Sequence, residues 1–211
     1  MNIPLLVRSS TCLFASALLG LLGSGCATTR AISLDETGAS IVSVADWGGT
    51  PDTAAHPIQT VRAVTIHHGG VPFTRSEDPK LYLQHLQQWS RSEKKWSDIP
   101  YHYLIDLDGT MYAGRDIRYA GDTNTEYNPD GHALICVLGN FEEVEPNAKQ
   151  LDAIVRLSAW LCRQYHLSPE TIKSHRDYSS QTVCPGKNLY VYLQNGYIRN
   201  GVTKLLEGDT K

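Results

Sequence analysis

The chain has 211 residues and a mass of 23.4 kDa, a length that favours a single domain. Hydrophobic residues make up 41% and charged residues 19%, which is a globular rather than a disordered composition. With 19 Lys and Arg against 22 Asp and Glu, the net charge of -3 leaves no basic excess to neutralise phosphates, which argues against a nucleic-acid partner. Nothing in the composition demands more than a monomer.

The first 25 residues have the pattern of an export signal. Arg8 is the only charged side chain before Cys26, residues 11–22 are apolar, and Gly23 begins a run of small residues. The apolar stretch is shorter than the ~20 residues that a membrane span needs. The segment resembles a bacterial lipoprotein signal, which implies that Cys26 is lipidated as the first residue of the mature chain. Gly23 departs from the Leu usual in such signals, so ordinary secretory cleavage and an uncleaved anchor stay open as alternatives.

The sequence therefore divides into a signal peptide at 1–25, a lipidated tether at 26–43 and a folded domain at 44–211. Residues 27–43 are small, polar and weakly patterned, as expected of a linker. We expect an exported protein that its lipid holds to a membrane. Ala27 rather than Asp follows Cys26, and by resemblance to lipoprotein sorting this favours the periplasmic face of the outer membrane.

Alternating strand and helix patterns predict an α/β fold for the domain. Residues 61–68 are β-branched and apolar, and residues 133–138 are continuously apolar, as in buried strands. Two alternating runs within 101–113 surround Asp108-Gly109, which is a strong hairpin signal. Further patterns predict helices at 79–93 and 148–165, a short strand or extended loop at 172–177, and a terminal helix starting at 189. The interleaving predicts one domain with a central mixed β-sheet flanked by helices.

The positions of the five cysteines indicate which of them is available for a functional role. Cys12 leaves with the signal and lipid occupies Cys26, so an odd number remains in an oxidising compartment: Cys136, Cys162 and Cys184. Cys136 lies on a predicted core strand and Cys162 on the apolar face of a predicted helix. Buried thiols or one mutual disulfide explain that pair, which leaves Cys184 for another role.

Histidine and cysteine, two residue types that bind zinc, stand at the ends of predicted elements. His67 and His68 end the strand at 61–68, His175 follows another short strand, and Cys184 lies in a Cys-Pro-Gly turn. A His, His and Cys set leaves the fourth zinc position to water, which is the catalytic rather than the structural arrangement. The ligands are too far apart in sequence to form a short motif, so spacing alone does not establish the site. The other histidines, His56, His85, His102, His132 and His166, fit ordinary hydrogen-bonded positions.

The order of motifs resembles the type-2 zinc N-acetylmuramoyl-L-alanine amidases, the family that includes peptidoglycan recognition proteins and phage amidases. Each piece is weak alone, but together they cover residues 44–193, nearly the whole domain. The matching segments are VADWG at 44–48, VTIHH at 64–68, DIPYHY at 98–103, LDGTMYAGR at 107–115, VLGNF at 137–141, SHRD at 174–177 and CPG at 184–186. The resemblance implies an amidase or peptidoglycan-recognition-protein-like fold.

Carried over by position, the resemblance implies that Zn²⁺ is held by His67, His175 and Cys184. Tyr101 matches the catalytic tyrosine, Thr182 a second catalytic hydrogen-bonding position, and His68 lines the substrate groove. The stretch between His175 and Cys184 is one residue longer than in the recognition proteins, which puts the placement of Thr182 in doubt. Cys136 stands where intracellular members carry a catalytic Glu, so this chain sides with the tyrosine-using branch and Cys136 receives no active-site role.

The implied reaction is hydrolysis of the amide between N-acetylmuramic acid and L-alanine in peptidoglycan or muropeptides. Arg115 ends the predicted hairpin, where either a contact with a stem-peptide carboxylate or a structural role fits. A non-catalytic muropeptide-binding module on the same fold is the alternative function. Binding-only members commonly lose the third ligand, so the presence of Cys184 favours an enzyme.

Overall fold

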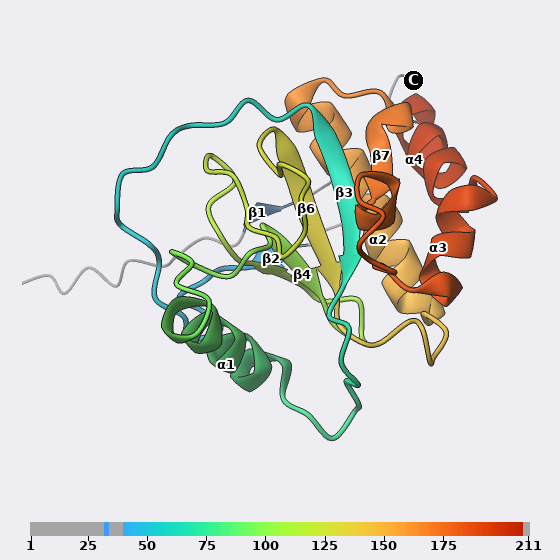
Figure 1. Cartoon of the computed structure of the whole chain (residues 1–211). Coiled ribbons are helices and arrows are strands. Elements are labelled where there is room, and N and C mark those ends of the chain that lie inside the picture. The colour runs from blue at the N-terminus through green and yellow to red at the C-terminus, as the bar shows by residue number, and fades with distance from the viewer. Residues whose placement is uncertain (1–31, 34–39, 209–211) are drawn as a thin grey trace, which may run out of the picture.

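The structure, a computed structural model, describes residues 32–33 and 40–208. Predictions that fall on residues 1–31, including the signal peptide and lipidated Cys26, lie outside these described residues. The described chain builds one seven-stranded sheet with helices on both faces (Figure 1). The strands are β1 (Ile32–Ser33), β2 (Ser40–Val42), β3 (Ala63–His68), β4 (Tyr103–Ile105), β5 (Met111–Ala113), β6 (His132–Val137) and β7 (Ile172–Ser174).

The sheet is mixed, as predicted. Its order is β1-β2-β5-β4-β6-β3-β7; β4, β6, β3 and β7 run parallel to one another, while β5 is antiparallel to β4 and β1 to β2. Parallel neighbours bring their carboxyl ends to the same edge of a sheet. The residues that follow β3 and β7 therefore meet at one edge, although more than a hundred positions separate them.

The helices cover the two faces unequally. Helix α1 (Pro79–Ser92) lies on one face, and α2 (Ala148–Tyr165), α3 (Lys187–Gln194) and α4 (Tyr197–Gly208) lie on the other (Figure 1). Val64 and Ile66 of β3 belong to the larger apolar cluster under the three helices. Because side chains alternate along a strand, His67 points to the α1 face, where a smaller cluster surrounds Leu83 and Leu104.

Local capping explains where the two long helices begin. The Asp78 side chain accepts the backbone N–H of Lys80, and Pro79 occupies the first helical position of α1. Asn147 and Gln150 form a reciprocal capping box at the start of α2. The predicted starts at 79 and 148 are confirmed because the signals that set them are local in sequence.

Three predicted boundaries need correction. The tether proposed for 26–43 runs into the sheet, because β2 pairs with β5 and Ile41 is buried in the larger cluster. The segment 172–177 splits into strand β7 and a short 3-10 helix, η2 (His175–Asp177). The terminal helix is two helices, α3 and α4, with Gly196 between them in a left-handed conformation (φ 79°) that a residue with a Cβ rarely adopts.

Other predictions on the domain are confirmed. The strands around Asp108-Gly109 form an antiparallel hairpin, β4 and β5. Cys136 and Cys162 are buried free thiols, so the disulfide alternative does not hold. Among residues 32–33 and 40–208, no helix combines the length and apolar character needed to cross a bilayer.

One buried histidine makes stability depend on pH. His102 is 1% exposed; its Nδ1 accepts the N–H of Leu134 and its Nε2 donates to the carbonyl of Tyr119, both at 2.9 Å. Burial is the main cause that lowers the pKa of His102 to about 4. The folded state thus favours neutral imidazole, while the unfolded chain binds a proton near pH ~6.5. The stabilisation that the neutral His102 imidazole gives to the folded state is complete above about pH 6.5 and is lost as the pH falls from about 6.5 to about 4.

We therefore expect His102→Gln to flatten the pH dependence of the unfolding free energy by about 3 kcal/mol across that window. Glutamine can keep one acceptor and one donor at this position but has no titrating ring. Urea denaturation of the native chain and the variant at about pH 7 and about pH 4 measures the difference. Equal pH dependence in the two proteins would contradict the assignment.

Candidate metal centre and substrate groove

His67 reaches the site from the carboxyl end of β3. It is only 2% exposed, and its ring faces the α1 side of the sheet. The register pairs His67 with Cys136 of β6, which lies beside it and is also buried. Strand β3 is central and apolar, so it holds this imidazole with little freedom.

His175 arrives from the neighbouring strand. The β3–β7 register pairs Ile66 with Ser174, so the next residue, His175, stands beside His67; the two ring centroids are 4.8 Å apart. The turn into η2 is closed by Asp177, whose carboxylate accepts the Ser174 N–H at 2.7 Å and the Ser174 hydroxyl at 2.6 Å. The Ser-His-Arg-Asp motif is therefore a capped turn that fixes the backbone of His175.

Besides the contact of its sulfur with His67, Cys184 makes three hydrogen bonds that position it. Its N–H donates to the Thr182 hydroxyl at 3.1 Å, its carbonyl accepts the Arg176 N–H at 2.9 Å, and its Sγ accepts the His68 N–H at 3.4 Å. Gly186 completes the turn at φ 87°, and a Cβ there would lie 2.4 Å from the Phe141 carbonyl carbon. Only glycine fits this turn, which anchors the sulfur to both β3 and η2.

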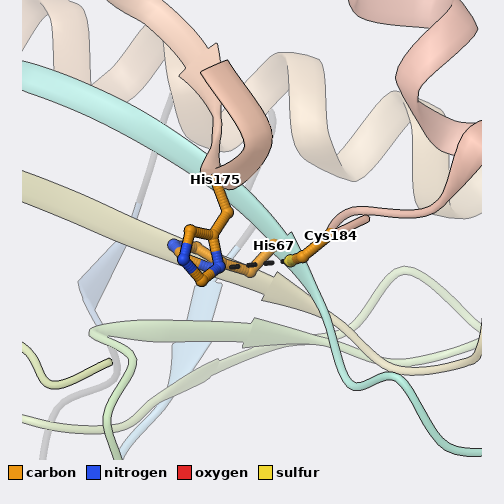
Figure 2. Close-up of side chains that lie close together, drawn as sticks. All are labelled: His67, His175 and Cys184. Atoms are coloured by element: carbon orange, nitrogen blue, oxygen red, sulfur yellow. Dashed lines mark hydrogen bonds between the residues drawn. The ribbon is translucent and has the colours of Figure 1, made fainter. Parts of the chain in front are cut away.

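The three side chains converge on one point (Figure 2). One potential ligand atom from each of His67, His175 and Cys184 lies within 4.8 Å of the other two. Cys184 Sγ is 3.6 Å from His67 Nδ1. A tetrahedral zinc ion with ordinary Zn–S and Zn–N bonds separates sulfur and nitrogen by roughly 3.6 Å. The spacing therefore fits zinc, and three protein ligands would leave a fourth position open.

The protonation states also fit a metal site. Burial lowers the pKa of His67 well below its usual value and that of His175 to about 4, so both imidazoles are neutral at pH 7. Burial raises the pKa of Cys184 to about 12, and a bound divalent cation would reverse this by stabilising the thiolate. His67 Nε2 is buried without a hydrogen-bond partner. A buried polar atom without a partner lowers the stability of the fold, and a bound metal at this site would account for this cost.

The three candidate metal ligands line a groove of about 390 Å³. One wall comes from α1, whose Tyr82, Leu86 and Trp89 follow one another at helical spacing over about 10 Å. The opposite wall is the loop at 122–125. No Lys or Arg lines the groove in the part of the chain that the structure describes, and its polar lining includes imidazole, hydroxyl, amide, thiol and carboxylate groups.

Three other predicted site residues also line this groove. Tyr101 packs its ring 5.2 Å from that of His67. Thr182 reaches the groove despite the longer spacing before Cys184, and its hydroxyl oxygen accepts the Cys184 N–H. His68 lines the groove while its Nδ1 accepts the Phe141 N–H at 3.3 Å.

Arg115 lies apart from these residues. It is 7% exposed, and its guanidinium donates to the carbonyls of Asp98, Ile99 and Ala120 and to the Asp122 carboxylate. These acceptors already bind the guanidinium N–H groups that a substrate carboxylate would need for a bidentate contact. Of the two roles considered from the sequence, the contacts favour the structural one.

The groove wall formed by residues 122–125 was not predicted from the sequence. Thr123 and Thr125 both face His175, but they lie in a polar loop with no periodicity or motif to mark them. The wall from α1 was visible in principle, because Tyr82, Leu86 and Trp89 recur at helical spacing. Trp89 is 43% exposed, which the helical pattern alone does not reveal.

The fold agrees with comparisons to known proteins. The family model described as N-acetylmuramoyl-L-alanine amidase matches residues 57–187, and the chain belongs to this family. It is 35% identical over 160 residues to peptidoglycan-recognition protein SD of Drosophila melanogaster, which covers 73% of this chain and 84% of the relative.

Two solved structures illustrate the range of the family. The N-acetylmuramoyl-L-alanine amidase LysC from Clostridium intestinale superimposes with a TM-score of 0.58 at 28% identity, covering 71% of this chain and 90% of that one. Human PGRP-Iβ-C, solved in complex with glycosamyl muramyl pentapeptide, gives 0.63 at 27% identity over 72% and 93%. The family thus includes both named amidases and named recognition proteins.

Proposed function

We propose that this protein is a zinc-dependent amidase that hydrolyses the bond between N-acetylmuramic acid and L-alanine in peptidoglycan or its muropeptide fragments. The observation that carries the proposal is the convergence of His67, His175 and Cys184 within 4.8 Å at the floor of a groove. Membership of the amidase family and the likeness to a muropeptide-bound structure support this substrate class.

His67, His175 and Cys184 would hold the metal. Zinc bound by such a set supplies hydroxide from water at neutral pH and polarises a carbonyl oxygen. The neutral imidazoles suit this role because they need lose no proton to bind a cation. The groove would orient the lactyl carbonyl of the substrate toward this point.

Tyr101 would act as a hydrogen-bond donor. Burial raises the pKa of its phenol well above the ordinary value, so the hydroxyl keeps its proton throughout the neutral range. A phenol in this state is a poor base but a good donor to the oxyanion that develops when the carbonyl is attacked. Thr182 would add a second hydroxyl to the same wall, and His68 would contact the substrate beside it.

Removal of the metal should abolish hydrolysis. We expect chelator-treated protein to release no peptide from purified muropeptides and added zinc to restore the release, because the bound metal would supply hydroxide at neutral pH. Mass spectrometry of the products measures cleavage at the lactyl–alanine bond. Undiminished turnover by metal-stripped protein would refute zinc dependence.

The same experiment tests the second candidate, a non-catalytic muropeptide-binding module. The relative at 35% identity is named as a recognition protein, which keeps this candidate open. A zinc-loaded chain that binds muropeptides and leaves them intact would establish binding in place of catalysis. Cys184 and Tyr101, both in the groove, favour the enzyme.

Tyr101→Phe should lower kcat by about 10²–10³-fold, since it removes one donor to the developing oxyanion. Zinc affinity should stay unchanged, because Tyr101 is outside the set of ligand atoms. Steady-state kinetics on a defined muropeptide, together with a zinc titration of the same variant, separate the two effects. Retention of full kcat would show that the tyrosine is not catalytic.

We also propose, from the sequence alone, that the domain is exported and attached through a lipid on Cys26, most simply at the periplasmic face of the outer membrane. Cys26→Ser should move the protein from the membrane fraction to the soluble fraction, because its thiol would carry the acyl chains. Fractionation with an antibody against the domain measures this. Unchanged membrane partition of the variant would instead support an uncleaved anchor.

A further inference from the structure

Two threonines of the loop opposite α1 form a small hydrogen-bonded unit against His175. Thr125 Oγ1 lies 2.7 Å from His175 Nε2, and Thr123 Oγ1 lies 3.3 Å from the same nitrogen. The two hydroxyl oxygens are 2.9 Å apart, and the Thr125 N–H donates to Thr123 Oγ1 at 3.2 Å. Thr123 therefore braces Thr125 in place behind the imidazole.

These contacts divide the two nitrogens of His175 between two tasks. A neutral imidazole carries its proton on one nitrogen and a lone pair on the other. A threonine hydroxyl pairs with Nε2 in either direction; when Nε2 carries the proton, the Thr125 hydroxyl accepts the hydrogen bond and the lone pair stands on Nδ1. A histidine that binds a metal through one nitrogen commonly donates the other N–H to an oxygen, which fixes the ring and its tautomer.

We propose that Thr125 is a positioning residue for the metal site, and that its hydroxyl holds His175 in the tautomer and ring orientation that leave Nδ1 free to bind zinc. The inference rests on the zinc site of the proposed function. It adds a residue from a loop that no sequence motif marks. At 2.7 Å, this hydrogen bond is shorter than the one between His175 Nε2 and Thr123 Oγ1.

Zinc binding at Nδ1 would fix the direction of the hydrogen bond between His175 Nε2 and Thr125 Oγ1. Zinc at Nδ1 requires the proton on Nε2, so the ring donates and Thr125 Oγ1 accepts. The Thr125 hydroxyl can then donate its own proton to Thr123 Oγ1, 2.9 Å away. Without Thr125 Oγ1, Nε2–H would keep only the longer contact to Thr123, and the alternative tautomer would place a proton where the metal must bind.

Zinc affinity of the full chain tests the proposal. Thr125→Val keeps the size and branching of the side chain but removes the hydroxyl, and it should weaken zinc binding about 10–100-fold. Thr125→Ser restores the hydroxyl and should recover most of the affinity. Thr203→Val on α4 is a matched control, because the Thr203 hydroxyl bonds only the Arg199 carbonyl of its own helix. Competition with a chromophoric zinc chelator gives each dissociation constant.

Thermal unfolding of the zinc-free proteins separates positioning from folding. All four proteins should unfold at similar temperatures without metal, while added zinc should stabilise Thr125→Val less than the native chain. Less than a tenfold loss of affinity in Thr125→Val, or failure of Thr125→Ser to recover it, would overturn the proposal. If the native chain itself binds no zinc, both the proposed function and this inference fail. If the native chain binds zinc and Thr125→Val binds it equally well, only this inference fails.

Discussion

The parallel pairing of β3 with β7 is the constraint on which the site depends. It places His175 beside His67 at one edge of the sheet. The Cys184 turn is then tied to β3 through the His68 N–H and to η2 through the Arg176 N–H. The ligand set is therefore as rigid as the sheet, which limits the reorganisation that metal binding requires.

The two faces of the sheet have different roles: one is buried in the main hydrophobic core, and the other carries the groove. Three helices bury one face in a continuous apolar cluster, which supplies most of the hydrophobic stabilisation. The other face carries only α1 and a smaller cluster, and this thinner cover leaves room for the groove. Helix α1 both buries Leu83 in the smaller cluster and presents Tyr82, Leu86 and Trp89 to the groove.

Two residues near the groove, Arg115 and Cys136, have a structural rather than a chemical role. Arg115 ties together the segment around Asp98 and the loop that begins at Asp122. Cys136 lies beside His67 in the sheet, but its burial raises the pKa of the thiol well above the usual value. Proximity to the site is thus a poor guide to function without the burial and hydrogen bonds of each group.

The sequence by itself determined what is local: the start of α1 at Asp78-Pro79, the hairpin at Asp108-Gly109, and strand β3, because capping, turn chemistry and side-chain alternation act over a few residues. Family motifs also marked the ligands. Only the tertiary structure decided that the three ligand atoms meet, that the Arg115 guanidinium is occupied, and that Thr125 stands behind His175. These are contacts between segments far apart in the chain, and strand pairing and packing set them, with no local pattern to encode them.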